Sequence, residues 1–420
     1  MMPADLLNLA HLRAFRLVAD TGSATRAAAL LDRAQSAVTR SVQELETALS
    51  EPLFERRSSG MLPTAVGHVV LDRCARIFIE LEALAQWCAA REARRRTLGE
   101  DTLPAWLLNT RRLQLFVALA RDRHMPSTAS AFGISQPAVS SAMRVLECGS
   151  GITLFHRSPR GVQLTPEGEI FLLHVRRALN ALRHVRDDVA ALHGNIQGTV
   201  TVGALPLGRT RMLPAAIARM SALHPGVRVV TDESAYESLL ADLRAGDVDF
   251  ILGALRENDA DTARGLASER LMAEDMVVLA RSGHPLAQQK DLSVSDLRNA
   301  QWIVSHMQSP ARGLFEAQFK RLKLKPPIPS VETTDLAMIR GLLMGTDMIA
   351  AAFAQQLHYE IASGQLAVLD VPLSGSRLET GLTLRVDSAP SPAARALIDA
   401  IRLAVADAAP SAYPPGITLA

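Results

Sequence analysis

One stretch of the chain decides its fold: SQPAVSSAMRVLECGSGITLFHRSPRGVQLTPEG, residues 135–168. In its first part, apolar residues recur at steps of four and three, which is the spacing of one helix face: Val139, Met143, Leu146. In its second part, the apolar pair Leu154-Phe155 is followed by a polar turn that carries arginine and ends at Gly161. We therefore predict a helix over residues 136–148 followed by a β-hairpin, or wing.

The same pattern occurs earlier in the chain as AQSAVTRSVQELETALSEPLFERRSSGMLPTAVG, residues 34–67. A shift of 101 positions aligns residues 12–67 with 113–168 without a gap, and 15 of the 56 pairs are identical. Chance gives roughly three identities in such a comparison. The chain therefore carries two copies of one module.

Each copy begins with a helix whose apolar residues form one stripe: Leu12, Phe15, Val18 and Ala19 in copy one, and Leu113, Phe116, Leu119 and Ala120 in copy two. We expect a second, alanine-rich helix over 26–31 or 128–132, and then the third helix. In copy one this third helix turns four apolar residues inward: Val38, Val42, Leu45, Leu49. Each copy should end in a long helix, from Val66 to about Arg95 and from Glu167 to about Leu192.

The opposite face of each third helix carries uncharged or cationic hydrogen-bonding side chains near the helix N-terminus. These residues are Gln35, Ser36, Thr39, Arg40 and Gln43 in copy one, and Gln136, Ser140, Ser141 and Arg144 in copy two. Such side chains can reach base edges in a DNA major groove, and a helix N-terminus tolerates a phosphate. Taken alone, the same pattern also fits an ordinary solvated helix face.

The wings favour the DNA interpretation, because arginines there can clamp the sugar-phosphate backbone beside the groove. We expect this role for Arg56 and Arg57 in copy one, and for Arg157 and Arg160 in copy two. Residues 1–196 carry 24 arginines against 19 acidic residues, whereas residues 197–420 carry 21 basic and 24 acidic residues. The modest basic surplus of the front part fits a polyanionic partner.

At this point the chain resembles a known family. The segments Ser135-Gln136-Pro137-Ala138-Val139-Ser140, Leu154-Phe155-His156-Arg157 and Gly161-Val162-Gln163-Leu164-Thr165-Pro166-Glu167-Gly168 resemble the DNA-binding domain of LysR-type transcription regulators. The resemblance implies that Pro137 caps the recognition helix, that this helix enters the major groove, and that Arg157 and Arg160 grip phosphates. It also implies that the long helix of each copy pairs two subunits.

Both copies depart from the family pattern. Copy one has Ala34-Gln35-Ser36-Ala37 in place of Ser-Gln-Pro-Ala, which puts its role in DNA reading in doubt. Copy two has Arg123-His124-Met125-Pro126-Ser127 in place of Gly-Ser-x-Thr, which indicates a different start for its second helix. The alternative to two DNA-reading copies is that one reads DNA and the other serves as a packing or oligomerisation module.

The back half changes to short apolar strands that alternate with helices, which predicts an α/β domain with largely parallel strands. The expected strands are Val200–Ala204, Val227–Thr231, Phe250–Gly253, Met276–Ala280, Trp302–Val304, Met348–Phe353 and Leu382–Val386. Ligands in such sheets bind beyond the carboxyl ends of the strands. This directs attention to residues 204–208, 234–236, 305–309 and 333–335.

These segments also resemble the effector domain of LysR-type regulators, among them His224-Pro225-Gly226-Val227 and Leu243-Arg244-Ala245-Gly246-Asp247. The resemblance implies a two-lobed, periplasmic-binding-protein-like (type 2) fold with a small-molecule effector in its cleft. Carried over by position, the pocket residues are Leu205, Leu207, Ser234, Tyr236, Gln308, Ser309, Thr333 and Thr334. The stretch Ala204-Leu205-Pro206 is most similar to regulators that answer to sugars or aromatic acids, and Arg209, Arg211 and Arg312 either serve the ligand or face water.

Other classes of protein find little support in the sequence. There is no phosphate-binding glycine loop, no metal-spaced His/Cys set and no nucleophile elbow, so we expect no enzyme, no cofactor and no metal. No apolar run is long enough to span a membrane and the start lacks an export signal, so we expect a cytoplasmic protein. Cys74, Cys88 and Cys148 are expected to be reduced thiols, buried or half-buried.

The predicted organisation is therefore two all-α winged helix-turn-helix domains followed by the α/β effector domain. Residues 1–96 form the first winged unit with its helix, 97–108 a linker, 109–193 the second unit with its helix, 198–408 the effector domain and 409–420 a tail. The expected partners are double-stranded promoter DNA, a small-molecule effector and further copies of the chain in a homodimer or homotetramer.

Overall fold

The structure is a computed structural model that describes residues 6–57, 60–91, 103–158, 161–256, 265–371, 373, 375–386 and 388–407. The chain forms two compact units. The N-terminal unit comprises Met1–Gly198 with Ala245–Asp247, and the C-terminal unit comprises Thr199–Arg244 with Val248–Ala420. None of the helices in the described ranges is both long and apolar enough to cross a membrane.

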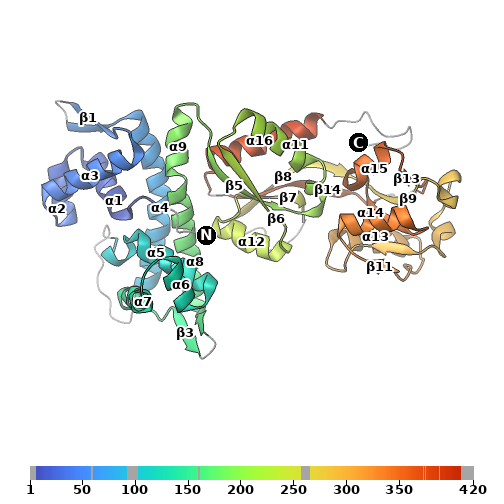
Figure 1. Ribbon diagram of the computed structural model, residues 1–420, viewed down its shortest axis with the longest axis horizontal. Helices are drawn as coiled ribbons and strands as arrows, with labels where there is room; N and C mark the ends of the chain where they lie inside the picture. The colour runs from blue at the N-terminus through green and yellow to red at the C-terminus, as the bar shows by residue number, and fades with distance from the viewer. Residues whose placement is uncertain are drawn as a thin grey trace. The chain divides into compact units, whose positions relative to one another are not determined.

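The N-terminal unit contains the two copies, and their elements begin 101 residues apart (Figure 1). Copy one consists of α1 (Leu9–Thr21), α2 (Ala24–Leu31), α3 (Gln35–Leu49), β1 (Phe54–Arg57), β2 (Gly60–Pro63) and α4 (Ala65–Ala89). Copy two follows a short η1 (Ala105–Leu107) and consists of α5 (Thr110–Asp122), α6 (Met125–Ala131), α7 (Gln136–Ser150), β3 (Phe155–Ser158), β4 (Gly161–Leu164), α8 (Pro166–Arg183) and α9 (Val185–Leu192). Each pair of strands forms an antiparallel hairpin, as predicted.

Identical residues in the two copies make identical local contacts. The Glu46 carboxylate accepts a hydrogen bond from the Leu53 amide at 2.8 Å, and Glu147 accepts one from the Leu154 amide at 2.9 Å. The hydroxyls of Thr64 and Thr165 accept from the amides three residues further on, which caps α4 and α8. These contacts fix the joints between recognition helix, wing and long helix.

Each long helix requires glycine near its start, because no space is left there for a side chain. A Cβ atom on Gly67 would clash with the carbonyl oxygen of Leu53, and one on Gly168 would clash with that of Leu154. The backbone of the long helix therefore lies directly against the segment that precedes the wing. This close approach explains why glycine recurs at this position in both copies.

Several predicted helix boundaries were wrong. The α4 helix ends at Ala89 rather than near Arg95, and the arginines at 94–96 lie outside the described residues. The second long helix is interrupted at His184, so that α8 and α9 replace one continuous helix. The cap of α7 is Ser135, while Pro137 lies in the first turn, where its missing N–H costs no hydrogen bond.

The second helix of copy two starts in register with that of copy one, so the expectation of a different start was wrong. It begins at Met125, three residues before the predicted start at Thr128, because His124 caps it by accepting a hydrogen bond from the Ser127 amide. Ser23 does the same for the amide of Arg26 in copy one. An imidazole nitrogen thus takes the place of a serine hydroxyl.

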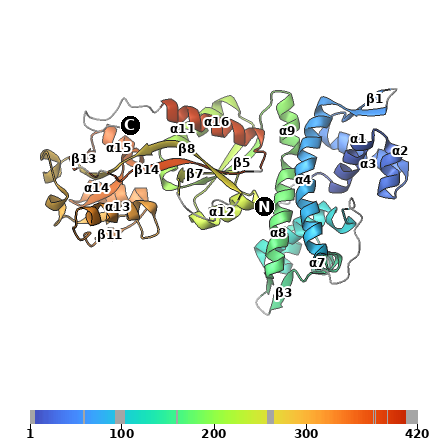
Figure 2. The ribbon, with the colours of Figure 1, turned by 180° about the vertical axis from the view of Figure 1, so that it is seen from behind.

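The two long helices pack against each other in an antiparallel pair (Figure 2). The buried apolar residues of this pair include Val70, Cys74, Ile77, Phe78, Leu81, Leu84 and Cys88 on α4, and Phe171, Val175, Ala178, Leu179, Leu182, Val185 and Val189 on α8 and α9. Burial raises the pKa of the Cys74 and Cys88 thiols to about 12. The prediction of a buried or half-buried thiol was wrong for Cys148, which is exposed on α7.

The C-terminal unit contains two five-stranded sheets, with strand orders β6-β5-β7-β14-β8 and β11-β10-β12-β9-β13. The strands of the first sheet are β5 (Gly198–Ala204), β6 (Val227–Asp232), β7 (Phe250–Ala254), β8 (Leu266–Glu274) and β14 (Leu378–Arg385). Those of the second are β9 (Met276–Arg281), β10 (Trp302–Val304), β11 (Val331–Glu332), β12 (Ile349–Phe353) and β13 (Leu366–Val368). The chain therefore passes between the sheets twice, after β8 and before β14.

Helices connect and cover these sheets, with α11 and α16 packed on each other (Figure 1). Their bounds are α10 (Pro206–Arg209), α11 (Met212–Leu223), α12 (Tyr236–Ala245), η2 (Pro285–Gln288), η3 (Val294–Leu297), α13 (Pro310–Arg321), α14 (Leu336–Gly345), η4 (Ala354–Leu357), α15 (His358–Ala362) and α16 (Pro392–Asp407). The two-lobed α/β architecture is confirmed.

The expectation of largely parallel strands was wrong. The pairs β5–β7, β10–β11 and β10–β12 are parallel, but β14 runs antiparallel to β7 and β8, and β9 runs antiparallel to β12 and β13. No clear signal in the sequence marks β8, because its segment LASERLMAE alternates only weakly between apolar and polar residues. It is held in the sheet by its long pairing with β14.

Candidate DNA-binding and effector sites

The third helix of copy one turns its polar face to solvent. Val38, Val42 and Leu45 are buried on its inner side. The predicted residues of the outer side are Gln35, Ser36, Arg40 and Gln43, which are exposed, and Thr39, which is half-buried. We name these five residues the copy-one face.

Two contacts order the copy-one face. The Gln35 amide donates to the Thr39 hydroxyl at 3.1 Å, and Arg40 Nε donates to the Glu44 carboxylate at 2.8 Å. Hydrogen bonding from Arg40 lowers the pKa of Glu44. Glu44 lies beside Arg40 on this side of the helix. Its carboxylate therefore offsets part of the positive charge that Arg40 can offer to a DNA phosphate.

The third helix of copy two presents the corresponding copy-two face: Gln136, Pro137, Ser140, Ser141 and Arg144. Ser140 is half-buried and the other four are exposed, while Val139, Met143 and Leu146 are buried beneath them. Val145 stands where copy one has Glu44, so this face lacks the acidic group.

Both third helices begin without a side-chain cap. Neither Ala34 before α3 nor Ser135 before α7 makes a side-chain hydrogen bond to the first amides of its helix. The first amides, of Gln35 and Ser36 in α3 and of Gln136 in α7, are suited to an anion such as a DNA phosphate, whereas the Ala37 and Ala138 amides donate to the carbonyls of Ala34 and Ser135, and Pro137 has no N–H.

The wings follow directly after the buried anchors Leu53 and Leu154. Arg57 is exposed at the end of β1 and pairs with Glu55 at 2.9 Å. Arg56 and Arg157 occupy β1 and β3, but their side chains, like the whole of Arg160, lie outside the described part of the structure.

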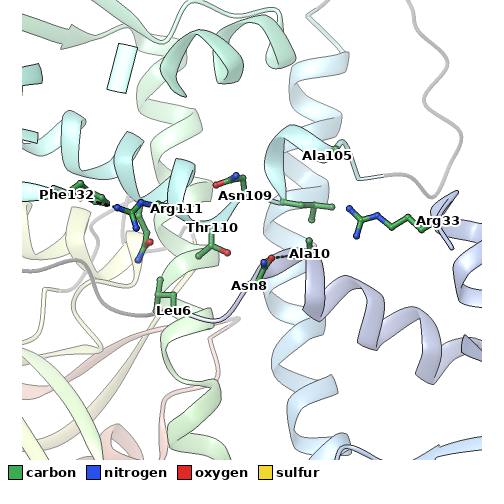
Figure 3. A pocket seen from close by; sticks show the side chains of 11 residues that line it. Leu6, Asn8, Ala10, Arg33, Ala105, Asn109, Thr110, Arg111 and Phe132 are labelled. Atoms are coloured by element: carbon green, nitrogen blue, oxygen red, sulfur yellow. Dashed lines mark hydrogen bonds between the residues drawn. The ribbon is translucent and has the colours of Figure 1, made fainter. Parts of the chain in front are cut away.

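A cavity of about 600 Å³ lies between the two copies, at the starts of α1 and α5 (Figure 3). Asn8 and Asn109, which cap these helices, both line it. Arg33 reaches it from copy one and Arg111 from copy two, where Arg111 donates to the Phe132 carbonyl at 3.0 Å. The cavity marks where equivalent parts of the two copies meet.

The C-terminal unit holds a cavity of about 300 Å³ between its two sheets. One wall comes from the ends of β5, β6 and β7, and the other from the ends of β10, β11 and β12. Seven of the eight residues predicted for the effector line it: Leu205, Leu207, Ser234, Tyr236, Gln308, Ser309 and Thr334. Thr333 does not, since its hydroxyl instead accepts a hydrogen bond from the Asp335 amide at 3.0 Å.

The cavity is lined by apolar side chains and by charged ones of both signs, Arg209 and Arg256 with Glu233 and Glu237. Apolar side chains come from Leu205, Leu207, Ile339, Phe353 and Leu378. Arg209 also lines it, is half-buried, and has no ion-pair or hydrogen-bond partner for its side chain among the described residues. The α12 and α13 helices begin at Tyr236 and Pro310 in the wall, and their N-terminal dipoles add positive potential.

The other two arginines considered from the sequence are engaged within the protein. Arg312 is buried and bonds to Glu316 at 2.6 Å and Glu332 at 3.1 Å, whereas Arg211 donates to the side chain of Gln355 at 3.3 Å. The sequence reasoning also missed Arg256, which stacks over the Tyr236 ring at 3.7 Å and pairs with Glu237 at 3.3 Å. Nothing in the local sequence marks Arg256, because only the sheet brings the end of β7 beside α12.

Comparison with known proteins agrees with this architecture. The family described as "Bacterial regulatory helix-turn-helix protein, lysR family" matches residues 9–68 and again 110–169, and "LysR substrate binding domain" matches residues 193–406. The transcriptional regulator GalR of Pseudomonas putida is 47% identical over 409 residues, which cover 97% of this chain and 100% of that protein. The regulator PcaQ of Agrobacterium fabrum is 33% identical over 300 residues, 71% of this chain and 95% of that protein.

Solved structures share the fold. A full-length OxyR variant from Pseudomonas aeruginosa aligns with a TM-score of 0.54 and 22% identity, over 70% of this chain and 98% of that one. Full-length CbnR in complex with its target DNA aligns with a TM-score of 0.52 and 20% identity, over 70% and 99%. The chain is thus a regulator rather than an enzyme, and it belongs to the LysR family of transcriptional regulators, with the family's helix-turn-helix region present twice.

Proposed function

We propose that this regulator reads promoter DNA with the copy-one and copy-two faces, each placed in a major groove. The support is that both faces are exposed while the apolar residues beneath them are buried. Glutamine, serine, threonine and arginine side chains hydrogen-bond to base edges, and the wing arginines Arg56, Arg57, Arg157 and Arg160 are suited to phosphates. Copy two is better suited to bind DNA than copy one, because the copy-two face carries no acidic residue that could pair with its arginine, Arg144.

A second reading remains, in which copy two alone contacts DNA and copy one serves as an oligomerisation module. The Arg40–Glu44 pair favours it, since it reduces the positive charge of the copy-one face.

For the effector we propose an aromatic carboxylate bound in the cavity between the two sheets. Arg209 lacks a partner among the described residues and lines the cavity together with the apolar side chains of Leu205, Leu207 and Phe353, which suits one anionic group attached to a flat apolar body. Tyr236, held beneath Arg256, offers an aromatic surface. A neutral sugar would satisfy the hydroxyls of Ser234, Ser309 and Thr334 but would leave the positive charge of Arg209 uncompensated.

Since both sheets contribute to the cavity, a bound ligand favours the arrangement of the lobes in which both walls contact it. We propose that this shift alters DNA binding in a cytoplasmic homodimer or homotetramer.

The test for DNA binding uses a fluorescent duplex from the intergenic region beside the gene, with a scrambled duplex for comparison. We expect tighter binding to the intergenic duplex, and Arg144→Ala should remove about 1–3 kcal/mol of that preference. Arg157→Ala should instead weaken binding to both duplexes and lower the salt slope by about one. Equal binding of the two duplexes by the unaltered protein would refute the proposal.

A further inference from the structure

The two copies of the module are joined face to face inside one chain, and equivalent residues meet each other. Leu9 and Thr110 occupy equivalent positions, the first residues of α1 and α5. The Thr110 hydroxyl accepts a hydrogen bond from the Leu9 amide at 3.0 Å and donates to the Leu7 carbonyl at 3.1 Å. When a residue contacts the equivalent residue of another copy, both lie close to the twofold axis that relates the copies. Because the two copies here differ in sequence, this axis is a pseudo-twofold axis.

The long helices repeat this relationship. Seven of the nine buried apolar positions of α4 correspond, at the shift of 101, to the seven buried apolar positions of α8 and α9, and the other two, Val66 and Ala85, correspond to the half-buried Glu167 and the exposed Arg186. Each copy therefore uses the same helix face toward the other, which is the mark of a self-complementary interface.

Polar contacts across the helix pair give the direction of the two helices, although their acidic partners are not equivalent, because Trp87 and Ala181 stand at the positions that correspond to Asp188 and Glu80. Arg73 and His174 are equivalent, and each bonds to an acidic residue of the other helix: Arg73 to Asp188 at 2.6 Å, and His174 to Glu80 at 2.8 Å. Going forward along α4 from Arg73 to Glu80, the partner moves backward from Asp188 to His174, so the helices are antiparallel. An antiparallel pair is what a twofold axis perpendicular to the helices generates.

From these contacts we propose that one chain acts as a built-in dimer of DNA-binding modules and reads two unlike half-sites. The face of α4 that could take a second subunit is already filled by α8 and α9 of the same chain. Two recognition helices related by a pseudo-twofold axis are then presented by a single chain. The proposal rests on the DNA-reading role proposed above and adds the architecture of the DNA target.

The half-sites must differ because the two faces differ at equivalent positions. Arg40 corresponds to Ser141, and Gln43 corresponds to Arg144. The arginine of the copy-two face therefore lies about one turn further along its helix than the arginine of the copy-one face. Arginine favours guanine, whereas serine and glutamine favour other base edges. A symmetric pair of subunits would read a palindrome, while this chain is built for a non-palindromic pair of half-sites spaced by about one helical turn of DNA or a multiple of it.

The experiment is selection of bound sequences from a randomised duplex library by the full-length protein and by matched variants. The unaltered protein should enrich two half-sites of different sequence. Gln35→Ala should erase the sequence preference of one half-site and Gln136→Ala that of the other. Thr47→Ala, exposed at the far end of α3, is the control and should leave both unchanged.

A gain-of-symmetry variant sharpens the test. Arg40→Ser combined with Gln43→Arg and Glu44→Val gives copy one the charge pattern of copy two, and the enriched site should become more nearly palindromic. A single half-site that ignores the α3 variants would overturn the proposal, as would a palindrome whose two halves are both lost with Gln136→Ala. Both of these results would leave DNA reading by copy two intact, whereas failure to enrich any sequence would refute the proposed function itself.

Discussion

The guanidinium of Arg73 in α4 donates two hydrogen bonds to the carboxylate of Asp188 in α9, at 2.6 and 2.9 Å. Their side chains are only 6% and 11% exposed, so this bidentate ion pair is withdrawn from water. It joins residues 115 positions apart in the sequence and links the two copies of the module. A buried pair of this kind does little harm when intact, but loss of one partner leaves an uncompensated buried charge.

Arg73→Ala should lower the free energy of unfolding of the N-terminal unit by about 3–5 kcal/mol, because Asp188 would remain buried and unpaired. The measurement is urea unfolding followed by tryptophan fluorescence in a Trp302→Phe background, in which Trp87 and Trp106 report on this unit. Arg121→Ala is the control, since the Arg121 side chain is 66% exposed and its pair with Asp122 should contribute about 0–1 kcal/mol. Equal effects of the two substitutions would contradict the structure.

Gly67→Ala and Gly168→Ala should each destabilise the N-terminal unit by about 1–3 kcal/mol, because the added methyl group overlaps a backbone carbonyl. Gly313→Ala in α13 should act in the opposite direction on the C-terminal unit and stabilise it by up to about 1 kcal/mol, since its Cβ meets open space within a helix. Thermal unfolding of the three variants measures whether each substitution lowers or raises the stability of its unit. A neutral Gly168→Ala would show that the backbone approach is looser than described.

Arg209→Ala should abolish the thermal stabilisation that benzoate or 4-hydroxybenzoate gives to the C-terminal unit, because the carboxylate loses its cation. The probes are compared with glucose, which should give no shift with the unaltered protein. Arg219→Ala, exposed on α11, is the matched control and should keep the response. A shift with glucose that survives Arg209→Ala would favour the sugar alternative.

The stability of the C-terminal unit should depend on pH through Glu274, which lies at the end of β8 where the chain passes between the sheets. Burial raises the pKa of this carboxyl from 4.5 to about 7. The folded unit therefore binds the proton more tightly than the unfolded chain, and the free energy of unfolding should fall by roughly 3 kcal/mol as pH rises from 4.5 to 7.

Glu274→Gln should remove this slope, because the amide stays neutral and can still accept the hydrogen bond from the Gln355 backbone. Urea unfolding at several pH values between 4 and 8, followed at Trp302 in a Trp87→Phe, Trp106→Phe background, measures it. Asp399→Asn, exposed on α16, should leave the slope unchanged. An unaltered slope in Glu274→Gln would assign the pH dependence to another group.

Thiol labelling of the native protein should proceed rapidly at one cysteine. Cys148 is exposed, whereas Cys74 and Cys88 are buried and hold thiols whose pKa is raised to about 12. A chromogenic disulfide reagent should therefore react with one equivalent of thiol before unfolding and with all three cysteines after it. Cys148→Ser should abolish the fast phase, and its persistence would show that the helix pair opens readily.

The sequence by itself determined the two modules and their wings, while the two lobes of the C-terminal domain were implied by the family resemblance. This was possible because local signals agreed with one another: apolar spacing in the third helices, the anchors Leu53 and Leu154, and glycine at 67 and 168 recur at one fixed shift. The same residue types at the same positions make the same hydrogen bonds, so a repeat in sequence became a repeat in structure. Seven of the eight residues predicted for the effector line one cavity, because loops at the ends of parallel strands converge on one edge of a sheet.

Only the tertiary structure decided how the two copies meet and where the charge of the pocket lies. No sequence pattern brings Leu9 to Thr110 or Arg73 to Asp188, since these contacts depend on how two distant helices dock. For the same reason the sequence ranked Arg209, Arg211 and Arg312 equally, although packing pairs Arg312 with two carboxylates and leaves Arg209 at the cavity wall. Residue type fixes what a side chain can bind, but its neighbours in space decide whether that capacity is already used.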